Sequence, residues 1–219
     1  MEAHEYSGHV ERAGPVARRT VATADGTVEI RKLSVGAMDN NAYVLVDTGS
    51  GAALLIDAAD EAERLLAEVD GMDLTAIVTT HGHRDHWQAL NRLADLTGAP
   101  VWLHPDDASM VPRAADRAAA HDEVLRFGAG SVRLLHTPGH TSGSTCLLLG
   151  DGHLFTGDTL FPGGPGRTTS VEDFAAIMRS LRERVFTLGD DTWVYPGHGD
   201  DTTLGAERGS LDEWQARGW

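Results

Sequence analysis

The hydrophobic residues of this chain follow two different spacings. In the first third they alternate with polar residues at a period of two, which is typical of strands. We expect three strands here: residues 28–33, which alternate in this way, and the apolar runs at 43–46 and 52–56. Short turns join them, which indicates an antiparallel sheet. Residues 60–71 then change to helical spacing, with Asp60 as the expected N-cap, Glu63 in the capping-box position and Gly71 at the end.

The rest of the chain repeats this order of strands and helices. Further strands are expected at residues 76–80, 101–103, 132–136, 145–149, 153–156 and 192–195. One helix has Leu90, Leu93 and Ala94 on a single face and ends at Gly98, and a later helix is capped by Ser170. Two successive units of this kind predict an α/β fold of four layers, αβ/βα, in which two mixed sheets pack face to face with helices outside.

Two segments show no sustained periodicity. Residues 1–25 contain a Gly-Pro step and form an N-terminal arm of uncertain structure. Residues 105–130 mix acidic residues, proline and a polar run, and we expect an irregular loop there, because long loops often form lids or walls of sites. The length of 219 residues fits one domain, 1–219, that includes the arm.

Composition narrows the classes of function. The formal charge of -15 and the pI near 5.0 argue against nucleic acid as a partner, because phosphate-binding surfaces are usually basic. No secretory signal and no membrane-length apolar run are visible, so we expect a cytoplasmic protein that does not contact membranes. Cys146 is the only cysteine and falls within an apolar strand; Lys32 is the only lysine, which we attribute to genome composition. The oligomeric state is not indicated.

The densest chemistry lies in His81-Gly82-His83-Arg84-Asp85-His86. Imidazole and carboxylate are ligands of zinc, iron and manganese, and the spacing is too tight for one ion to use all four side chains. The segment therefore predicts a site for two metal ions.

Three further candidate ligands each follow a glycine at the end of an expected strand. They are His140, Asp158 and His198. Strand ends from two sheets can meet at one edge of a sandwich, and a preceding glycine lets the backbone turn sharply. We expect these side chains to converge with the histidine-rich segment.

With these elements in this order, the chain resembles the metallo-β-lactamase superfamily, whose signature is His-x-His-x-Asp-His followed by a lone His, a lone Asp and a lone His. The sequences around His140, Asp158 and His198 are most similar to the glyoxalase II group, including its short members. The resemblance implies that His81, His83 and His140 hold one metal. It also implies that Asp85, His86 and His198 hold the second and that Asp158 bridges the two.

The resemblance implies a hydroxyacylglutathione hydrolase-like activity on a small-molecule thioester, such as an S-2-hydroxyacyl thiol. A hydroxide bridging two divalent ions would be the nucleophile, and Asp85 would orient or deprotonate the attacking water. Zinc is the first expectation for the metal, with iron and manganese as alternatives. True β-lactamases of this superfamily usually carry a cysteine where this chain has Asp158, which disfavours antibiotic hydrolysis.

Other activities remain open from the sequence. A persulfide dioxygenase would use a single iron held by His81, His140 and Asp158. A lactonase and a metal-binding module without turnover are further possibilities. Elemental analysis and oxygen uptake separate the dioxygenase from the hydrolase.

Three more residues have two interpretations each. Asp57 either hydrogen-bonds the far nitrogen of a ligand histidine or is a turn residue. Trp87 either contacts the substrate or anchors its helix in the core. Arg167 either binds an anionic substrate group or forms a structural ion pair, with a slight preference for the ion pair. Four histidines outside the pattern are interpreted as surface or internally bonded residues: His104, His121, His136 and His153.

Overall fold

A computed structural model describes residues 6–218, and its first half forms a mixed sheet of seven strands in sequence order. These strands are β1 (Ala17–Thr23), β2 (Gly26–Val35), β3 (Asn40–Asp47), β4 (Ala52–Ile56), β5 (Asp73–Val78), β6 (Val101–Leu103) and β7 (Arg117–Ala118). Neighbours are antiparallel from β1 to β4 and parallel from β4 to β7. The expected antiparallel start of this sheet is confirmed.

The second half forms a mixed sheet of six strands in the order β15-β14-β11-β10-β9-β8. Its strands are β8 (Val124–Phe127), β9 (Gly130–His136), β10 (Thr145–Leu149), β11 (His153–Gly157), β14 (Trp193–Pro196) and β15 (Thr202–Thr203). Only β11 and β14 pair in parallel. A separate small hairpin consists of β12 (Leu160–Phe161) and β13 (Gly164–Pro165).

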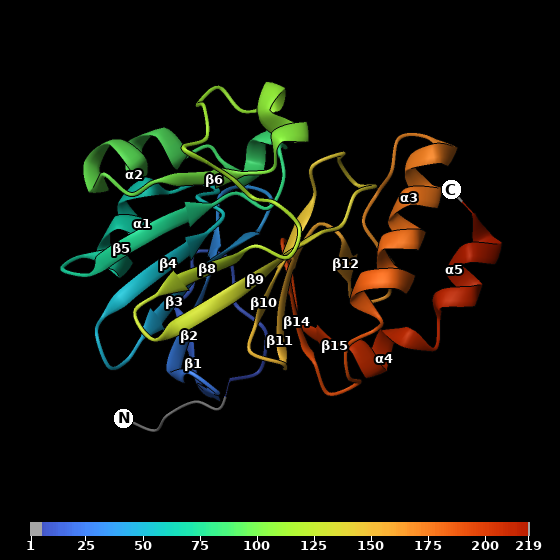
Figure 1. The fold of residues 1–219 in the computed structure, drawn as a ribbon, viewed down its shortest axis with the longest axis horizontal. Helices are drawn as coiled ribbons and strands as arrows, with labels where there is room; N and C mark the ends of the chain where they lie inside the picture. The colour runs from blue at the N-terminus through green and yellow to red at the C-terminus, as the bar shows by residue number, and fades with distance from the viewer. Residues whose placement is uncertain (1–5, 219) are drawn as a thin grey trace.

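Helices cover the outer faces of both sheets, which gives four layers (Figure 1). On the first sheet they are α1 (Ala62–Val69) and α2 (Leu90–Thr97), with the 3-10 turns η1 (Arg84–His86) and η2 (Pro105–Met110). On the second sheet they are α3 (Val171–Ser180), its π-helical extension η3 (Leu181–Val185), α4 (Leu204–Arg208) and α5 (Leu211–Arg217). The expected αβ/βα sandwich is confirmed.

Strand side chains alternate between two hydrophobic layers. In β3, Tyr43 and Leu45 pack between the sheets, whereas Val44 packs under α1 and α2. In β10, Leu147 lies between the sheets and Cys146 lies under α3. Because both faces of each sheet are covered, these strands are apolar at nearly every position. Burial of each large aliphatic side chain contributes about 1.5–3 kcal/mol.

Ser170 caps α3 as expected, because its Oγ accepts a hydrogen bond from the amide of Asp173 at 3.0 Å. The expected cap of α1 at Asp60 is wrong. The N-cap is Glu61, which has a left-handed φ of 49° and no side-chain cap, while Asp60 Oδ1 accepts a hydrogen bond from the amide of Glu61 itself. The helix therefore begins one residue later than the sequence pattern predicts.

Two segments expected to be irregular contain ordered elements. The N-terminal arm includes β1, which pairs with β2 along its whole length. Residues 105–130 contain η2, β7 and β8. These strands are short or largely exposed, so their sequences carry little hydrophobic signal.

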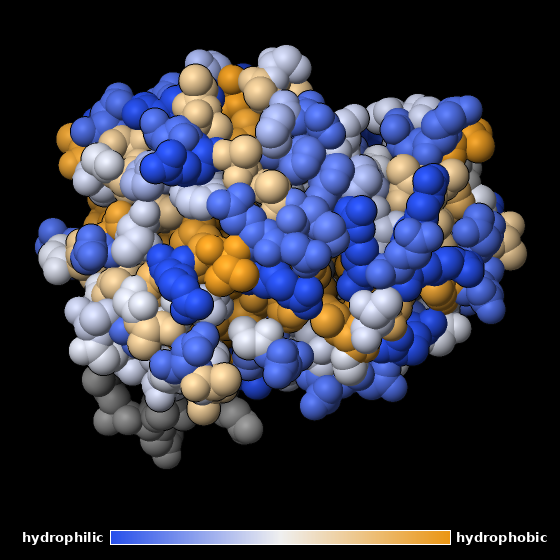
Figure 2. Space-filling view, in the orientation of Figure 1, coloured by the Kyte–Doolittle hydropathy of each residue, from blue (hydrophilic) through white to orange (hydrophobic). Residues whose placement is uncertain are grey.

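Most of the face shown in Figure 2 is hydrophilic, with smaller hydrophobic areas between the polar ones. Within residues 6–218, no helix is long and apolar enough to cross a bilayer, and the longest α-helix has 10 residues.

Candidate metal centre

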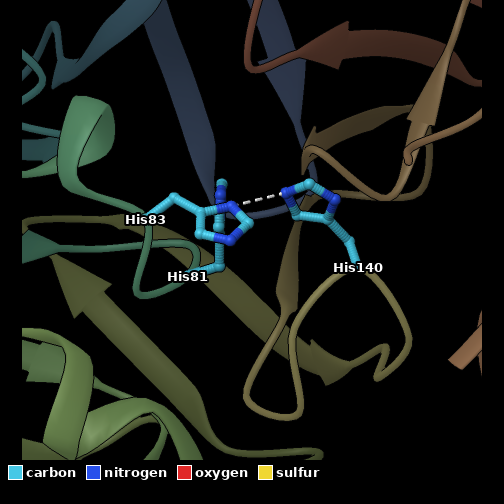
Figure 3. Close-up of side chains that lie close together, drawn as sticks. All are labelled: His81, His83 and His140. Atoms are coloured by element: carbon cyan, nitrogen blue, oxygen red, sulfur yellow. Dashed lines mark hydrogen bonds between the residues drawn. The ribbon is translucent and has the colours of Figure 1, made fainter. Parts of the chain in front are cut away.

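The first ligand group, His81, His83 and His140, joins the loop after β5 to the loop between β9 and β10. Potential ligand atoms of the three residues all lie within 4.8 Å of one another. His83 Nδ1 and His140 Nε2 are 2.8 Å apart, and the His81 ring centroid is 4.9 Å from that of His83 and 4.7 Å from that of His140. Figure 3 shows His83 and His140 pointing toward one another with His81 beside them.

The second ligand group, Asp85, His86 and His198, joins η1 to the turn after β14. Its potential ligand atoms also lie within 4.8 Å of one another. His198 Nε2 is 3.3 Å from both His86 Nε2 and Asp85 Oδ2. His86 Nε2 is 3.6 Å from the same carboxylate oxygen.

Asp158, which follows β11 directly, contacts both groups. Its Oδ2 lies 3.4 Å from His140 Nε2 in the first group and 3.6 Å from His198 Nε2 in the second. Its Oδ1 lies 3.4 Å from His86 Nε2. The structure thus brings together all seven predicted ligands, with this carboxylate between the two groups.

The donor set fits metal ions. His81 Nε2 and Asp158 Oδ1 are buried and form no hydrogen bond with any described residue. Buried polar atoms without partners cost free energy, so they are rare unless an ion or water satisfies them. Seven side chains also turn nitrogen and oxygen atoms toward one small region, where imidazole lone pairs would face one another without a cation between them.

Asp57 orients the second ligand group by contacting the His86 ring nitrogen that faces away from the other ligands. Its Oδ2 is 2.8 Å from His86 Nδ1 and also accepts a hydrogen bond from the Thr80 hydroxyl at 2.8 Å. Its Oδ1 accepts a hydrogen bond from the Thr80 amide at 2.7 Å. With a proton on Nδ1, His86 directs the lone pair of Nε2 toward Asp85 and Asp158, as metal-binding histidines commonly do. Of the two interpretations of Asp57, the structure shows the bond to a ligand histidine.

Backbone carbonyls orient two other ligand histidines. His140 Nδ1 lies 2.7 Å from the carbonyl oxygen of Arg167, and His198 Nδ1 lies 2.9 Å from that of Met38. Asn40 donates a hydrogen bond to Asp85 Oδ2 at 2.9 Å. The contributions of Met38 and Asn40 were missed from the sequence, because no local pattern relates the β2–β3 turn and the start of β3 to the distant His198 turn.

The site is charged even without metal. Burial lowers the pKa of His86, but Asp57, Asp158 and Asp85 outweigh it and raise this pKa to about 9. Burial and the neighbouring histidines hold the pKa of His81 well below its usual value. Hydrogen bonds from His198 and Asn40 lower the pKa of Asp85 despite the opposing effect of burial. The carboxylates therefore favour positive charge at this end of the sandwich.

Asp107 joins the two ligand-bearing loops and was also missed, since it lies in the expected irregular segment. The residue is fully buried. Its Oδ2 accepts hydrogen bonds from the Gly82 amide at 2.7 Å and the Thr141 hydroxyl at 2.6 Å. Its Oδ1 accepts one from the Gly143 amide at 2.8 Å. One carboxylate thus fixes the His81–His86 segment to the His140 loop.

Two glycines are required by close approach. A Cβ atom at Gly197 would lie 2.2 Å from Asp158 Oδ1 and 2.7 Å from His86 Cε1. A Cβ atom at Gly139, where φ is +143°, would lie 2.3 Å from the backbone nitrogen of Ile177. Any side chain at these positions would displace ligands or helix α3.

Trp87 and Arg167 lie in different environments. Trp87 Nε1 donates a hydrogen bond to the Gly82 carbonyl at 2.8 Å, and its ring packs against the hydrophobic layer of α1 and α2. This placement favours the anchoring interpretation. Arg167 is exposed and forms no ion pair with the described residues, so the preferred structural ion pair is not seen.

The histidines outside the pattern have local partners. The rings of His104 and His136 stack with centroids 3.8 Å apart and an interplanar angle of 11°. The His121 Nδ1 atom accepts a hydrogen bond from the amide of His136, and His153 Nδ1 lies 3.0 Å from the Tyr195 hydroxyl. Their interpretation as surface or internally bonded residues agrees with these contacts.

Comparison with known proteins places this geometry in a family. Hydroxyacylglutathione hydrolase GloC of Haemophilus influenzae is 31% identical over 205 residues, which cover 84% of this chain and 96% of that protein. A hydroxyacylglutathione hydrolase of Rhizobium meliloti is 40% identical over 162 residues, which cover 73% and 62%. Among solved structures, TTHA1623 in a di-iron-bound form superposes with a TM-score of 0.67 at 33% identity, covering 81% of this chain and 96% of that one. Residues 35–198 match the metallo-beta-lactamase superfamily. This chain therefore belongs to the metallo-beta-lactamase superfamily.

Proposed function

We propose that this protein is a dinuclear metallohydrolase that cleaves thioesters, with S-2-hydroxyacyl thiols as its substrate class. The observation that carries the proposal is the convergence of two complete ligand groups on Asp158. The hydroxyacylglutathione hydrolases at 31% and 40% identity support the choice of a thioester.

The residues divide the work between binding metal and guiding the reaction. His81, His83 and His140 would hold one ion, Asp85, His86 and His198 the other, and Asp158 would contact both. When bound, such a metal pair polarises a carbonyl and lowers the pKa of a water molecule toward neutrality. Asp85 is held by Asn40 and His198, so its carboxylate has a fixed direction from which to orient the attacking water and accept its proton.

A recess beside the first ligand group supports the proposal that the substrate is an anion. It has a volume of about 310 Å³, and Arg167, Phe174 and Arg217 are among the residues that line it. Its wall adjoins the site, because the carbonyl of Arg167 contacts His140. Both guanidinium groups are exposed and neither forms an ion pair with a described residue, so each can bind a carboxylate of the thiol carrier.

The second ligand group favours a hydrolase over the mononuclear iron dioxygenase. A single iron on His81, His140 and Asp158 would leave Asp85, His86 and His198 without a metal ion, although Asp57, Met38 and Asn40 all orient that group. A second metal ion would account for the hydrogen bonds that orient these side chains. A relative solved with two irons supports this count but leaves the identity of the metal open.

The test measures metal content and turnover in the same preparation. Protein purified without added metal is analysed for zinc, iron and manganese, and then assayed with S-lactoylglutathione, a simple lactone and a persulfide with oxygen monitoring. We expect two ions per chain and thioester hydrolysis. Asp158→Ala should abolish both, and Arg167→Ala should raise KM with little change in kcat. One iron with oxygen uptake, or thioester hydrolysis by a metal-free protein, would refute the proposal.

A further inference from the structure

The only lysine of the chain, Lys32, lies in the interior. Its side chain is 0% exposed, and its ammonium donates three hydrogen bonds. The acceptors are the carbonyl oxygen of Gly8 at 2.7 Å, the carbonyl oxygen of Gly199 at 2.8 Å and Asp201 Oδ1 at 2.6 Å. All three donors of the ammonium are therefore used.

The other partner of this ion pair is equally constrained. The side chain of Asp201 is 0% exposed, and its Oδ2 accepts hydrogen bonds from the Tyr6 hydroxyl at 2.7 Å and from Trp193 Nε1 at 2.9 Å. The guanidinium of Arg19 lies over the Trp193 ring at 4.3 Å from its centroid. Such a buried and fully bonded pair is weak evidence for stability but fixes the geometry of the segments that it joins.

One of those segments is the turn that carries His198. The carbonyl of Pro196 accepts hydrogen bonds from Asn41 Nδ2 and the Tyr43 hydroxyl, and the carbonyl of Gly197 accepts one from the Asn41 amide. Beyond His198, the carbonyl of Gly199 is held by Lys32 and by Asn41 Nδ2. The backbone is thus fixed on both sides of a ligand whose ring is exposed in part.

The residues of this ion-pair network lie largely outside the segment that matches the family. The match covers residues 35–198, whereas Tyr6, Gly8, Lys32 and Asp201 lie before or after it. The lysine that supports the His198 turn therefore lies outside the matched segment.

We propose that Lys32 is a positioning residue for the second metal site: by holding Gly199, it fixes the direction of His198 and sets the affinity of that site for a divalent ion. The proposal rests on the two-metal centre proposed above. Lys32 itself does not touch the ligand groups, and it acts through the turn between Pro196 and Gly199. Loss of its contact should affect the second ion selectively, because the His81, His83 and His140 group is supported separately by Asp107.

The test titrates metal-free protein with Co²⁺ in competition with a chromophoric chelator, so that the first and second equivalents are measured separately. The principal variant is Lys32→Met with Asp201→Asn, which removes both charges and leaves no buried ion without its partner. Lys32→Gln is the second variant, because its shorter amide keeps a donor but cannot make all three bonds. Tyr6→Phe is the matched control, since it removes a hydrogen bond to Asp201 but none to Lys32 or Gly199.

We expect the double variant to bind the second Co²⁺ about 10- to 100-fold more weakly and the first without change, as is usual when a support of a ligand is lost. Lys32→Gln should change the same equivalent by less, and Tyr6→Phe should leave both unchanged. Thr141→Val, which removes a hydrogen bond between Asp107 and the His140 loop, should weaken the first equivalent instead. Circular dichroism and thermal unfolding of the metal-free proteins verify that each variant is folded.

Two failures are distinguishable. A wild-type protein that binds fewer than two equivalents refutes the two-metal centre, and this inference with it. A wild type with two tight equivalents, together with folded Lys32 variants that match it or lose both equivalents equally, overturns the role of Lys32 alone.

Discussion

Replacement of Asp57 by asparagine tests how the second ligand group is oriented. The change keeps the shape of the side chain but replaces one carboxylate oxygen by an NH₂ group. Oδ1 of Asp57 accepts the Thr80 amide, and Oδ2 faces His86 Nδ1 and the Thr80 hydroxyl. An asparagine can keep its oxygen toward only one of these positions, so one N–H donor then faces another.

The structure gives the expected magnitude. If the amide oxygen stays on the Thr80 amide, the new NH₂ group faces His86 Nδ1, and the proton of the imidazole must move to Nε2, whose lone pair is needed to bind the metal. If the amide flips, a buried donor pair is left unsatisfied, at a cost of about 1–3 kcal/mol. The first arrangement avoids this cost, because the imidazole can move its proton whereas the Thr80 amide cannot, and it predicts a loss of about 10- to 100-fold in affinity for the second ion, which corresponds to about 1.4–2.8 kcal/mol.

The assay is isothermal titration of metal-free protein with Zn²⁺, with Asp47→Asn as the matched control. Asp47 is also a buried carboxylate that accepts hydrogen bonds from Ser50 and Ala129. It ends β3, seven residues from Asn40 beside the site, which at the rise of a strand is about 23 Å. The control should lower thermal stability and leave metal uptake unchanged. A folded Asp57→Asn protein with normal affinity for both ions would refute the orientation argument.

Three further outcomes are expected. Gly197→Ala places a methyl group 2.2 Å from Asp158 Oδ1 and should abolish uptake of the second Zn²⁺ in the same titration. Gly209→Ala is the control, because its methyl group meets no atom within 4 Å and should leave metal uptake intact. Equal binding by both variants would contradict the geometry. Burial raises the pKa of Cys146 to about 11, so its thiol should react with Ellman's reagent at pH 8 only after unfolding. Rapid labelling of the native protein would contradict the burial of this thiol. Burial, assisted by Arg19, lowers the pKa of His153 from 6.5 to about 4. Between pH 6.5 and 4 the unfolded chain therefore binds a proton on this residue that the folded chain does not, and stability falls as the pH drops through this range. His153→Gln should therefore lose less thermal stability than wild type between pH 7 and 5, and parallel curves for the two proteins would contradict this assignment.

The strands with both faces buried could be predicted from the sequence because their patterns are local. In β3 and β10, burial on both sides leaves apolar residues at almost every position, and glycines mark the strand ends. The ligand set was predictable for the same reason, since His81 to His86 is one continuous segment and the other ligands follow strands. Local order of this kind does not depend on how the sheets dock.

Residues that join distant segments could not be predicted in this way. Lys32 contacts Asp201 across 169 positions, and Asp107 contacts Gly143 across 36. Neither pair has a spacing that a periodic pattern can reveal, because the contact exists only after the two sheets have packed. The only lysine had no assigned role in the sequence, and its burial beneath the His198 turn became evident only in three dimensions. Short, exposed strands such as β7 and β8 were missed because they bury too little apolar surface to leave a pattern.

The distribution of ligands between the halves of the chain has a consequence for assembly. The first sheet supplies two side chains to each ligand group, and the second sheet supplies one, His140 to the first group and His198 to the second. A backbone cut in the exposed stretch at 120–123, between β7 and β8, would thus leave a complete group on neither fragment. Stoichiometric metal uptake by a mixture of the two fragments would therefore measure how many molecules have reassembled. Each ion would act as a removable cross-link between two separately produced fragments.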